Sequence, residues 1–152
     1  MAQYKATGVL NNSPSFMQAY GNLVGDDDTA TPTAALAVSD TIDLIRIPGG
    51  TRLQELFKKN GDFDTGTTVQ YKLGYRKADP SGQLTDVDNY FGSALTDLQA
   101  AVTGAAPTRY DFAPITFNED VFITLTVTAA AAGVTGTPSI TTYYRGIAVG
   151  TK

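Results

Sequence analysis

Carboxylates are the residues of this sequence best suited to chemistry, and they gather in two places. Asp26, Asp27 and Asp28 are consecutive, while Asp62 and Asp64 stand two residues apart in Asp-Phe-Asp-Thr-Gly. Oxygen ligands at this second spacing begin a calcium loop, because hard cations prefer carboxylate oxygens arranged around a turn. The glutamate that would complete such a loop is missing. Asp also bonds nearby backbone N–H groups in turns, so we predict that both stretches are turns that bind no metal or other cofactor.

Most other catalytic chemistry is excluded by composition. The sequence has no histidine and no cysteine, so Ser-His-Asp and Cys-His catalysis, thiolate metal sites and disulfide bonds are impossible within it. A pair of carboxylates can hydrolyse glycosides, but no isolated acid lies in an aromatic setting, and a carboxylate hydrolase is the weakest alternative. We therefore expect a protein that is not an enzyme.

The charge pattern also excludes classes of partner. The formal net charge is −4 and charged residues make up 17% of the chain, whereas nucleic-acid binding requires clustered Lys and Arg. The two short basic clusters, Lys58-Lys59 and Arg76-Lys77, have acids nearby. No apolar run reaches the roughly 18 residues of a membrane span, and the first residues lack the apolar core of a signal peptide. We expect no nucleic-acid partner, no membrane and synthesis in the cytoplasm.

The elements that position these groups are mainly β-strands. Apolar residues alternate with polar ones in two stretches, which indicates half-buried strands whose inward residues share one core. A tight turn is expected at residues 48–50, because proline fixes φ and the two glycines accept positive φ. Residues 140–149 are expected to form a closing strand. The inward residues of the two clearest strands are Val69, Tyr71, Leu73 and Tyr75, and Val121, Ile123, Leu125 and Val127.

One segment has the period of a helix. Apolar residues between positions 88 and 102 recur at spacings of three and four, which predicts one short amphipathic helix. We expect it to cover one side or end of the sheets. The residues of this stripe are Tyr90, Phe91, Ala94, Leu95, Leu98, Ala101 and Val102.

The pattern as a whole predicts an all-β fold. About seven or eight strands, with turns every eight to twelve residues, favour two packed antiparallel sheets over an α/β fold. Residues 1–38 are less regular and are expected to form an N-terminal arm or outer strands, with residues 39–152 as the β-sandwich domain. A surface rich in Thr, Ala and Gly with few charges suits packing against other proteins.

Three stretches resemble a known family. Residues 39–53 end a strand in Pro48-Gly49-Gly50, residues 61–66 carry the Asp-x-Asp-x-Gly loop, and residues 69–75 form a Gly-Tyr strand. With an Ala-rich helix expected at residues 97–101, they resemble the capsid decoration, or cement, proteins of tailed bacteriophages. The resemblance covers roughly half of the chain. It implies a jelly-roll-like β sandwich on the outside of a capsid shell, commonly as a trimer.

The resemblance therefore implies a non-enzymatic virion protein. Its partner would be the major capsid protein, and it would stabilise the outer surface of the shell by adding contacts across subunit junctions. We predict that the N-terminal arm contacts the shell through Tyr4, Phe16 and Tyr20. The alternatives are a phage tail or fibre adaptor and a carbohydrate-binding β-sandwich module, although the latter lacks tryptophan.

Overall fold

The computed structural model describes residues 1–6, 23–102 and 106–150 of this chain. Its described part is all-β, as predicted, with ten strands and one 3-10 turn. Three of the strands have only three residues each, which is why the sequence predicts fewer. The elements are β1 Gln3–Lys5, β2 Leu23–Ala30, β3 Thr41–Ile47, β4 Thr51–Asn60, β5 Gln70–Lys77, β6 Val87–Leu95, η1 Asp97–Gln99, β7 Thr108–Tyr110, β8 Ile115–Phe117, β9 Val121–Ala129 and β10 Ile140–Ala148.

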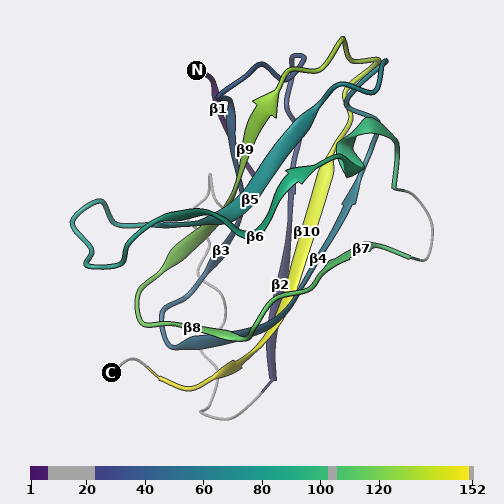
Figure 1. Cartoon of the computed structure of the whole chain (residues 1–152). Coiled ribbons are helices and arrows are strands. Elements are labelled where there is room, and N and C mark those ends of the chain that lie inside the picture. Colours follow the sequence, from purple (N-terminus) through teal and green to yellow (C-terminus); the bar gives the residue numbers. More distant parts are fainter. Residues whose placement is uncertain (7–22, 103–105, 151–152) are drawn as a thin grey trace.

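The strands form two five-stranded sheets that pack face to face (Figure 1). Sheet A has the order β1-β3-β9-β5-β6, and sheet B has the order β2-β10-β4-β7, with β8 also paired to β4. The strand pairs β2·β10, β3·β9, β4·β7 and β5·β6 are antiparallel. The first half of the chain thus pairs in sequence with the second half, and the resulting ribbon wraps into two sheets. This is the jelly-roll topology that we predicted.

The predicted alternation of the two clearest strands is confirmed. In sheet A, β5 pairs with β9, which sets Leu73 opposite Leu125 and Tyr75 opposite Ile123. All eight inward residues predicted for these strands are buried, and they belong to one hydrophobic cluster together with residues of sheet B. Burying a large apolar side chain contributes roughly 1.5–3 kcal/mol, so these two central strands supply much of the core.

The turn at residues 48–50 is where the chain changes sheets. It joins the end of β3 in sheet A to the start of β4 in sheet B. Gly50 adopts a φ of +81°, a conformation that side chains with a Cβ rarely take. The predicted reversal is therefore confirmed, and it carries the chain across the sandwich instead of closing a hairpin.

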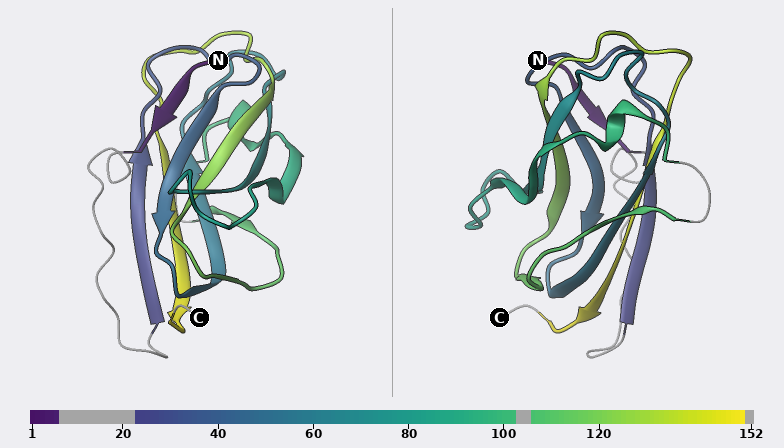
Figure 2. Two further views of the ribbon diagram at one scale, coloured as in Figure 1. Left: turned by 90° about the vertical axis from the view of Figure 1, so that its left-hand side faces the viewer. Right: turned by 45° about the vertical axis from the view of Figure 1, so that its right-hand side comes forward.

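The first strands lie at the edges of both sheets. Parallel pairing with β3 makes β1 the edge of sheet A, and pairing with β10 makes β2 the edge of sheet B. Both edges lie on the same side of the sandwich (Figure 2). The parts of residues 1–38 that the structure describes thus include two outer strands, and the division into an arm and a sandwich domain stays a prediction.

The helix predicted between residues 88 and 102 is wrong. Residues Val87–Leu95 form β6, and only the 3-10 turn Asp97–Gln99 follows. Antiparallel pairing with β5 overrides the helical spacing, and Phe91 packs its ring 6.5 Å from that of Tyr75. A Cβ on Gly74 would lie 2.0 Å from the carbonyl oxygen of Val87, so the glycine of β5 permits the close approach of β6.

Candidate functional site

Of the three residues predicted to contact a shell, Tyr4 is described. It lies in β1, and its half-buried side chain packs against the hydrophobic core. Phe16 and Tyr20 lie outside the described residues. Tyr4 therefore contributes to the fold of its own chain, and its role in shell contact stays a prediction.

The strand that carries Tyr4 is held by polar contacts at both ends. The backbone N–H of Ala2 donates to Asp40 Oδ1 at 2.7 Å, and the N–H of Ala6 donates to the carbonyl of Asp43 at 2.8 Å. The side chain of Gln3 donates to Asp43 Oδ2 at 3.2 Å. These contacts, with the pairing of β1 to β3, fasten residues 2–6 to sheet A.

Asp43 is the polar centre of the outer side of sheet A. Its side chain is fully buried, and it accepts hydrogen bonds from Arg76 through Nε at 2.9 Å and Nη2 at 2.5 Å. Thr124 Oγ1 donates to the same carboxylate at 3.0 Å, while the guanidinium of Arg76 lies 4.7 Å from the ring centre of Phe122. One carboxylate therefore joins β1, β3, β5 and β9.

The acidic stretch Asp26 to Asp28 is not a turn, contrary to our expectation. It lies within β2, paired residue by residue with Tyr144 to Thr142 of β10. Asp residues weaken strands in general. Among the described strands, β2 has a neighbour on one side only. An edge position of this kind tolerates charged side chains.

Asp62 and Asp64 do form a turn, and Asp64 is its anchor. The N–H of Asp64 donates to Asp62 Oδ1 at 3.0 Å. The buried carboxylate of Asp64 accepts four backbone N–H groups at 2.6–3.0 Å. These donors are Gly66, Thr68, Val69 and Ala132.

The ionisation of Asp64 follows from those donors. Burial by itself raises the pKa of the carboxyl, but the four N–H groups outweigh it and hold the pKa well below its usual value. The carboxylate therefore stays charged at neutral pH and fastens its loop to the chain near Ala132.

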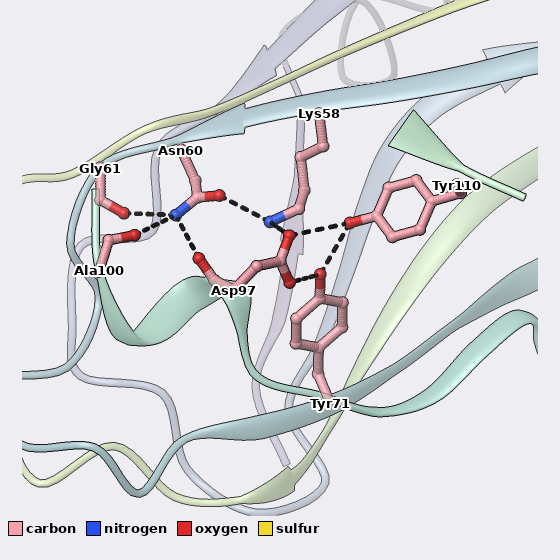
Figure 3. A network of polar contacts seen from close by, with 7 residues as sticks. All are labelled: Lys58, Asn60, Gly61, Tyr71, Asp97, Ala100 and Tyr110. Atoms are coloured by element: carbon pink, nitrogen blue, oxygen red, sulfur yellow. Dashed lines mark hydrogen bonds and ion pairs between the residues drawn. The ribbon is translucent and has the colours of Figure 1, made fainter. Parts of the chain in front are cut away.

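A second polar network lies between the sheets and was not predicted from the sequence (Figure 3). Lys58 of β4 points inward with its side chain fully buried, and its Nζ lies 2.9 Å from Asp97 Oδ2. The other oxygen of Asp97 accepts from the hydroxyl of Tyr71, which lies 2.8 Å from the hydroxyl of Tyr110. The network thus joins sheet A through β5, sheet B through β4 and β7, and the turn η1.

Asn60 completes this network at the top of β4. Its Oδ1 accepts from Lys58 Nζ at 2.7 Å. Its Nδ2 donates to three backbone carbonyls at 2.7–3.0 Å, which fixes the turn after β6 against β4. Those carbonyls belong to Gly61, Asp97 and Ala100.

The electrostatics of the network follow from its burial. Burial lowers the pKa of Lys58 to about 8, although the charge of Asp97 and its hydrogen bond act in the opposite direction. Burial raises the pKa of the Asp97 carboxyl, but Lys58 and the Tyr71 hydroxyl outweigh it and lower the pKa overall. Burial raises the pKa values of Tyr71 and Tyr110 well above their usual range. At neutral pH the network is one ion pair with two protonated tyrosines.

This arrangement is suited to holding elements together. A lysine with a lowered pKa and an adjacent carboxylate resemble the parts of an acid–base pair, but Lys58 has no exposed side-chain surface. Asp97 is about one-fifth exposed and borders a shallow cleft between the ends of β6 and β7. All the polar atoms described above have partners, so the contacts account for the shifted pKa values without a substrate.

The sequence contains one signal for this network. Inward residues of β4 follow Leu56 at a period of two, so that Lys58 and Asn60 face the core together with it. This alternation is hard to recognise in the sequence, because the apolar Phe57 points outward while the charged Lys58 points inward.

The described residues hold neither a cluster of metal ligands nor a membrane-spanning helix. No group of three or more acidic side chains lies close enough to hold a metal ion together. No helix in the described ranges is long and apolar enough to cross a membrane.

Two solved structures contain chains with this fold. A chain in "Capsid of Ralstonia phage GP4" superposes with a TM-score of 0.70 and 18% sequence identity, covering 96% of this chain and 98% of that chain. A chain in "Cyanophage Pam1 capsid asymmetric unit" gives a TM-score of 0.59 at 16% identity, covering 88% and 91%. No protein-family model matches the sequence, and no curated protein sequence matches it. Since both alignments span nearly whole chains, the shared fold is the entire jelly roll.

Proposed function

We propose that this protein is a non-enzymatic virion protein that binds the outside of a phage capsid shell and stabilises it. The single observation that carries the proposal is the end-to-end match with a chain in a phage capsid structure. The alignment covers 96% of this chain and 98% of that chain, so the match involves the complete jelly roll.

The physical properties of the fold support a binding role. The core is closed, and the buried charges at Lys58 and Asp64 have complete sets of partners. Such a block changes shape little on binding, so little of the interface energy is lost in ordering it. A decoration protein uses this rigidity by spanning the junctions between shell subunits, where each added contact opposes separation.

The proposed partner is the major capsid protein, and the proposed contact lies on the N-terminal side. Among the described residues, four large apolar side chains remain exposed, and three of these belong to residues 1–38: Met1, Leu23 and Val38. Met1 and Val38 flank the contact between Ala2 and Thr41, so an apolar contact with another protein at this place would lie beside β1. Tyr4, Phe16 and Tyr20 are our candidates for the aromatic part of this contact, and a trimer is the assembly that we propose.

Sedimentation with shells tests the proposal directly. Purified protein is mixed with undecorated shells of the phage that encodes it, and the bound fraction is measured after centrifugation. We expect saturable binding and a higher melting temperature of the decorated shells. A chain that stays in the supernatant at every concentration would disprove the decoration role.

The arm hypothesis needs a test of its own. Removing residues 2–20 deletes β1 and the contacts of Ala2, Gln3 and Ala6 with sheet A. We expect a cooperative melt at a lower temperature, with loss of shell binding. The variants Phe16→Ala and Tyr20→Ala separate the two effects, because they leave β1 in place. Wild-type occupancy in both variants would exclude the arm as the main contact.

A further inference from the structure

The outer face of sheet B carries side chains that lie outside the core formed by the described residues. The residues of β4 that alternate with the inward Leu56 and Lys58 point away from the core, and so do their partners in the neighbouring strands. We define the outer face of sheet B by seven of these residues: Arg52, Glu55, Phe57, Lys59, Arg109, Tyr143 and Arg145.

Two aromatic side chains stand at the centre of this face. Phe57 and Tyr143 are directly opposite each other in β4 and β10, and their rings are stacked at 4.9 Å with an interplanar angle of 13°. Both are only half-buried. They form a firm apolar centre on a sheet face that is otherwise polar.

Two arginines flank the aromatic pair and keep most of their donors. Arg109 Nη2 lies 3.7 Å from Glu55 Oε1, and Arg145 Nη1 lies 3.6 Å from Glu55 Oε2. These distances exceed those of hydrogen bonds, and the arginine side chains are 59% and 60% exposed. One glutamate therefore orients two guanidinium groups without occupying their N–H donors.

The charge of this face is opposite to that of the protein. The chain has a formal net charge of −4. The face has four cations and one acid, Glu55, and it adjoins Asp26 and Asp27 of β2, which line the same hollow as Lys59, Tyr143 and Arg145. A face with an excess of arginine favours an acidic partner surface and disfavours the same face of a second copy.

We propose that the outer face of sheet B docks onto an acidic protein surface of the shell, with Arg109 and Arg145 pairing to carboxylates of the partner. The inference rests on the proposed function, since it names a second contact with the same shell. Arginine and aromatic residues are enriched at the centres of interfaces, while lysine and glutamate are depleted there. Planar guanidinium groups pair with carboxylates through two parallel hydrogen bonds, which fixes the orientation of the docked protein.

Charge reversal with a matched control tests this inference. Arg145→Glu changes the charge on the proposed face, and Lys72→Glu makes the same change on the outer side of sheet A, where Lys72 is exposed beside Asp88. Both variants should melt close to the wild-type temperature, because both substitutions are at exposed positions. In sedimentation with shells we expect Arg145→Glu to weaken binding about 10-fold or more, and Arg109→Ala plus Arg145→Ala to do the same. Lys72→Glu should bind as wild type does.

The outcomes separate this inference from the proposed function. If wild-type protein binds no shell, the proposed function fails. If wild-type, Arg145→Glu and Lys72→Glu proteins bind equally, the protein is a shell binder but the docking face is wrong. If Arg145→Glu and Lys72→Glu weaken shell binding equally, the docking face is also wrong, because the loss then follows from the change in net charge. Wild-type protein could instead shift double-stranded DNA in a gel, and Arg145→Glu could abolish the shift. That result would overturn the inference, because the face would then bind nucleic acid.

Discussion

Two of the buried charge centres, one at Asp64 and the other at Lys58 with Asp97, are built in different ways. Asp64 is satisfied by backbone N–H groups, three of which lie within five residues of it in the sequence. The ion pair of Lys58 and Asp97 joins side chains almost forty positions apart and draws its other partners from further strands. One centre fixes a loop, whereas the other fixes the two sheets relative to each other.

This difference has a physical consequence for stability. A loop anchored by its own backbone can relax around a change and admit water. The surroundings of Lys58 cannot relax or admit water in this way, because β4, β5 and β7 pack around it. The effects of removing each centre should therefore differ in size and in extent.

Removing Asp97 should have the largest effect. Asp97→Ala leaves the ammonium of Lys58 buried without its counter-charge, which costs about 3–5 kcal/mol of the free energy of unfolding. Urea melts measure the loss. The double variant Lys58→Met with Asp97→Leu is the control, since replacing both charges by apolar groups often restores stability. A loss in Asp97→Ala below about 1 kcal/mol would contradict a clamping role.

Removing Asp64 should have a smaller and more local effect. Asp64→Ala leaves four backbone N–H groups without their acceptor, and we expect a loss of about 2–4 kcal/mol because water reaches part of the loop. Hydrogen exchange should quicken in residues 64–69 and near Ala132 while β5 and β9 stay protected. Faster exchange throughout both sheets would show that Asp64 stabilises the whole fold, as the pair of Lys58 and Asp97 does. The two centres would then not differ in extent.

The contrast also explains what the sequence predicts and what it does not. The alternation around Leu73 and Leu125 and the turn at Pro48 are local patterns, and they predict the antiparallel core. The jelly-roll order itself is implied only by the family resemblance. The helix was predicted because Phe91 and Leu95 have helical spacing, and it is absent because pairing of β6 with β5 is a long-range effect.

The same reasoning applies to the candidate sites. Asp64 was recognised as a turn former because its partners are close in sequence. The network at Lys58 was missed because its members come from four elements, and only the packed sheets bring them together. For Asp26 to Asp28 the sequence predicts a turn, because no local pattern indicates an edge strand that accepts three carboxylates.

Alkaline pH should separate the two centres further. The pKa of Lys58 is about 8 in the folded protein against 10.5 in the unfolded chain, so the unfolded state binds more protons between these values. The free energy of unfolding should therefore rise with pH in this window, by up to about 3 kcal/mol at about 1.4 kcal/mol per pKa unit. Above pH 10 the raised pKa values of Tyr71 and Tyr110 act in the opposite direction, since the unfolded state then loses its tyrosine protons first.

Urea melts of wild type and Lys58→Met between pH 7.5 and 10 provide the measurement. The rise should be present in wild type and absent in Lys58→Met, whereas Asp64→Ala should keep it. Asp64 has a lowered pKa, so its contribution to the free energy of unfolding changes only at acid pH. That contribution is fully present above the unfolded pKa of about 4 and is lost as pH falls through the folded pKa. A wild-type profile that is flat from pH 8 to 10 would contradict the assignment to Lys58.

Calcium should have the smallest effect, with no change in melting temperature. A cation at Asp64 would have to displace N–H donors, because Oδ1 accepts from Gly66 and Ala132 and Oδ2 accepts from Thr68 and Val69. These N–H groups occupy the carboxylate lone pairs that a calcium ion would require. Asp62 likewise already accepts a hydrogen bond from the N–H of Asp64. A site filled at 100 times its dissociation constant would add about 2.7 kcal/mol to the free energy of unfolding, which a melt detects easily. A shift of that size, lost in Asp62→Asn plus Asp64→Asn, would make the local centre a metal site, and the loop would then owe its order to an ion and not to its own backbone.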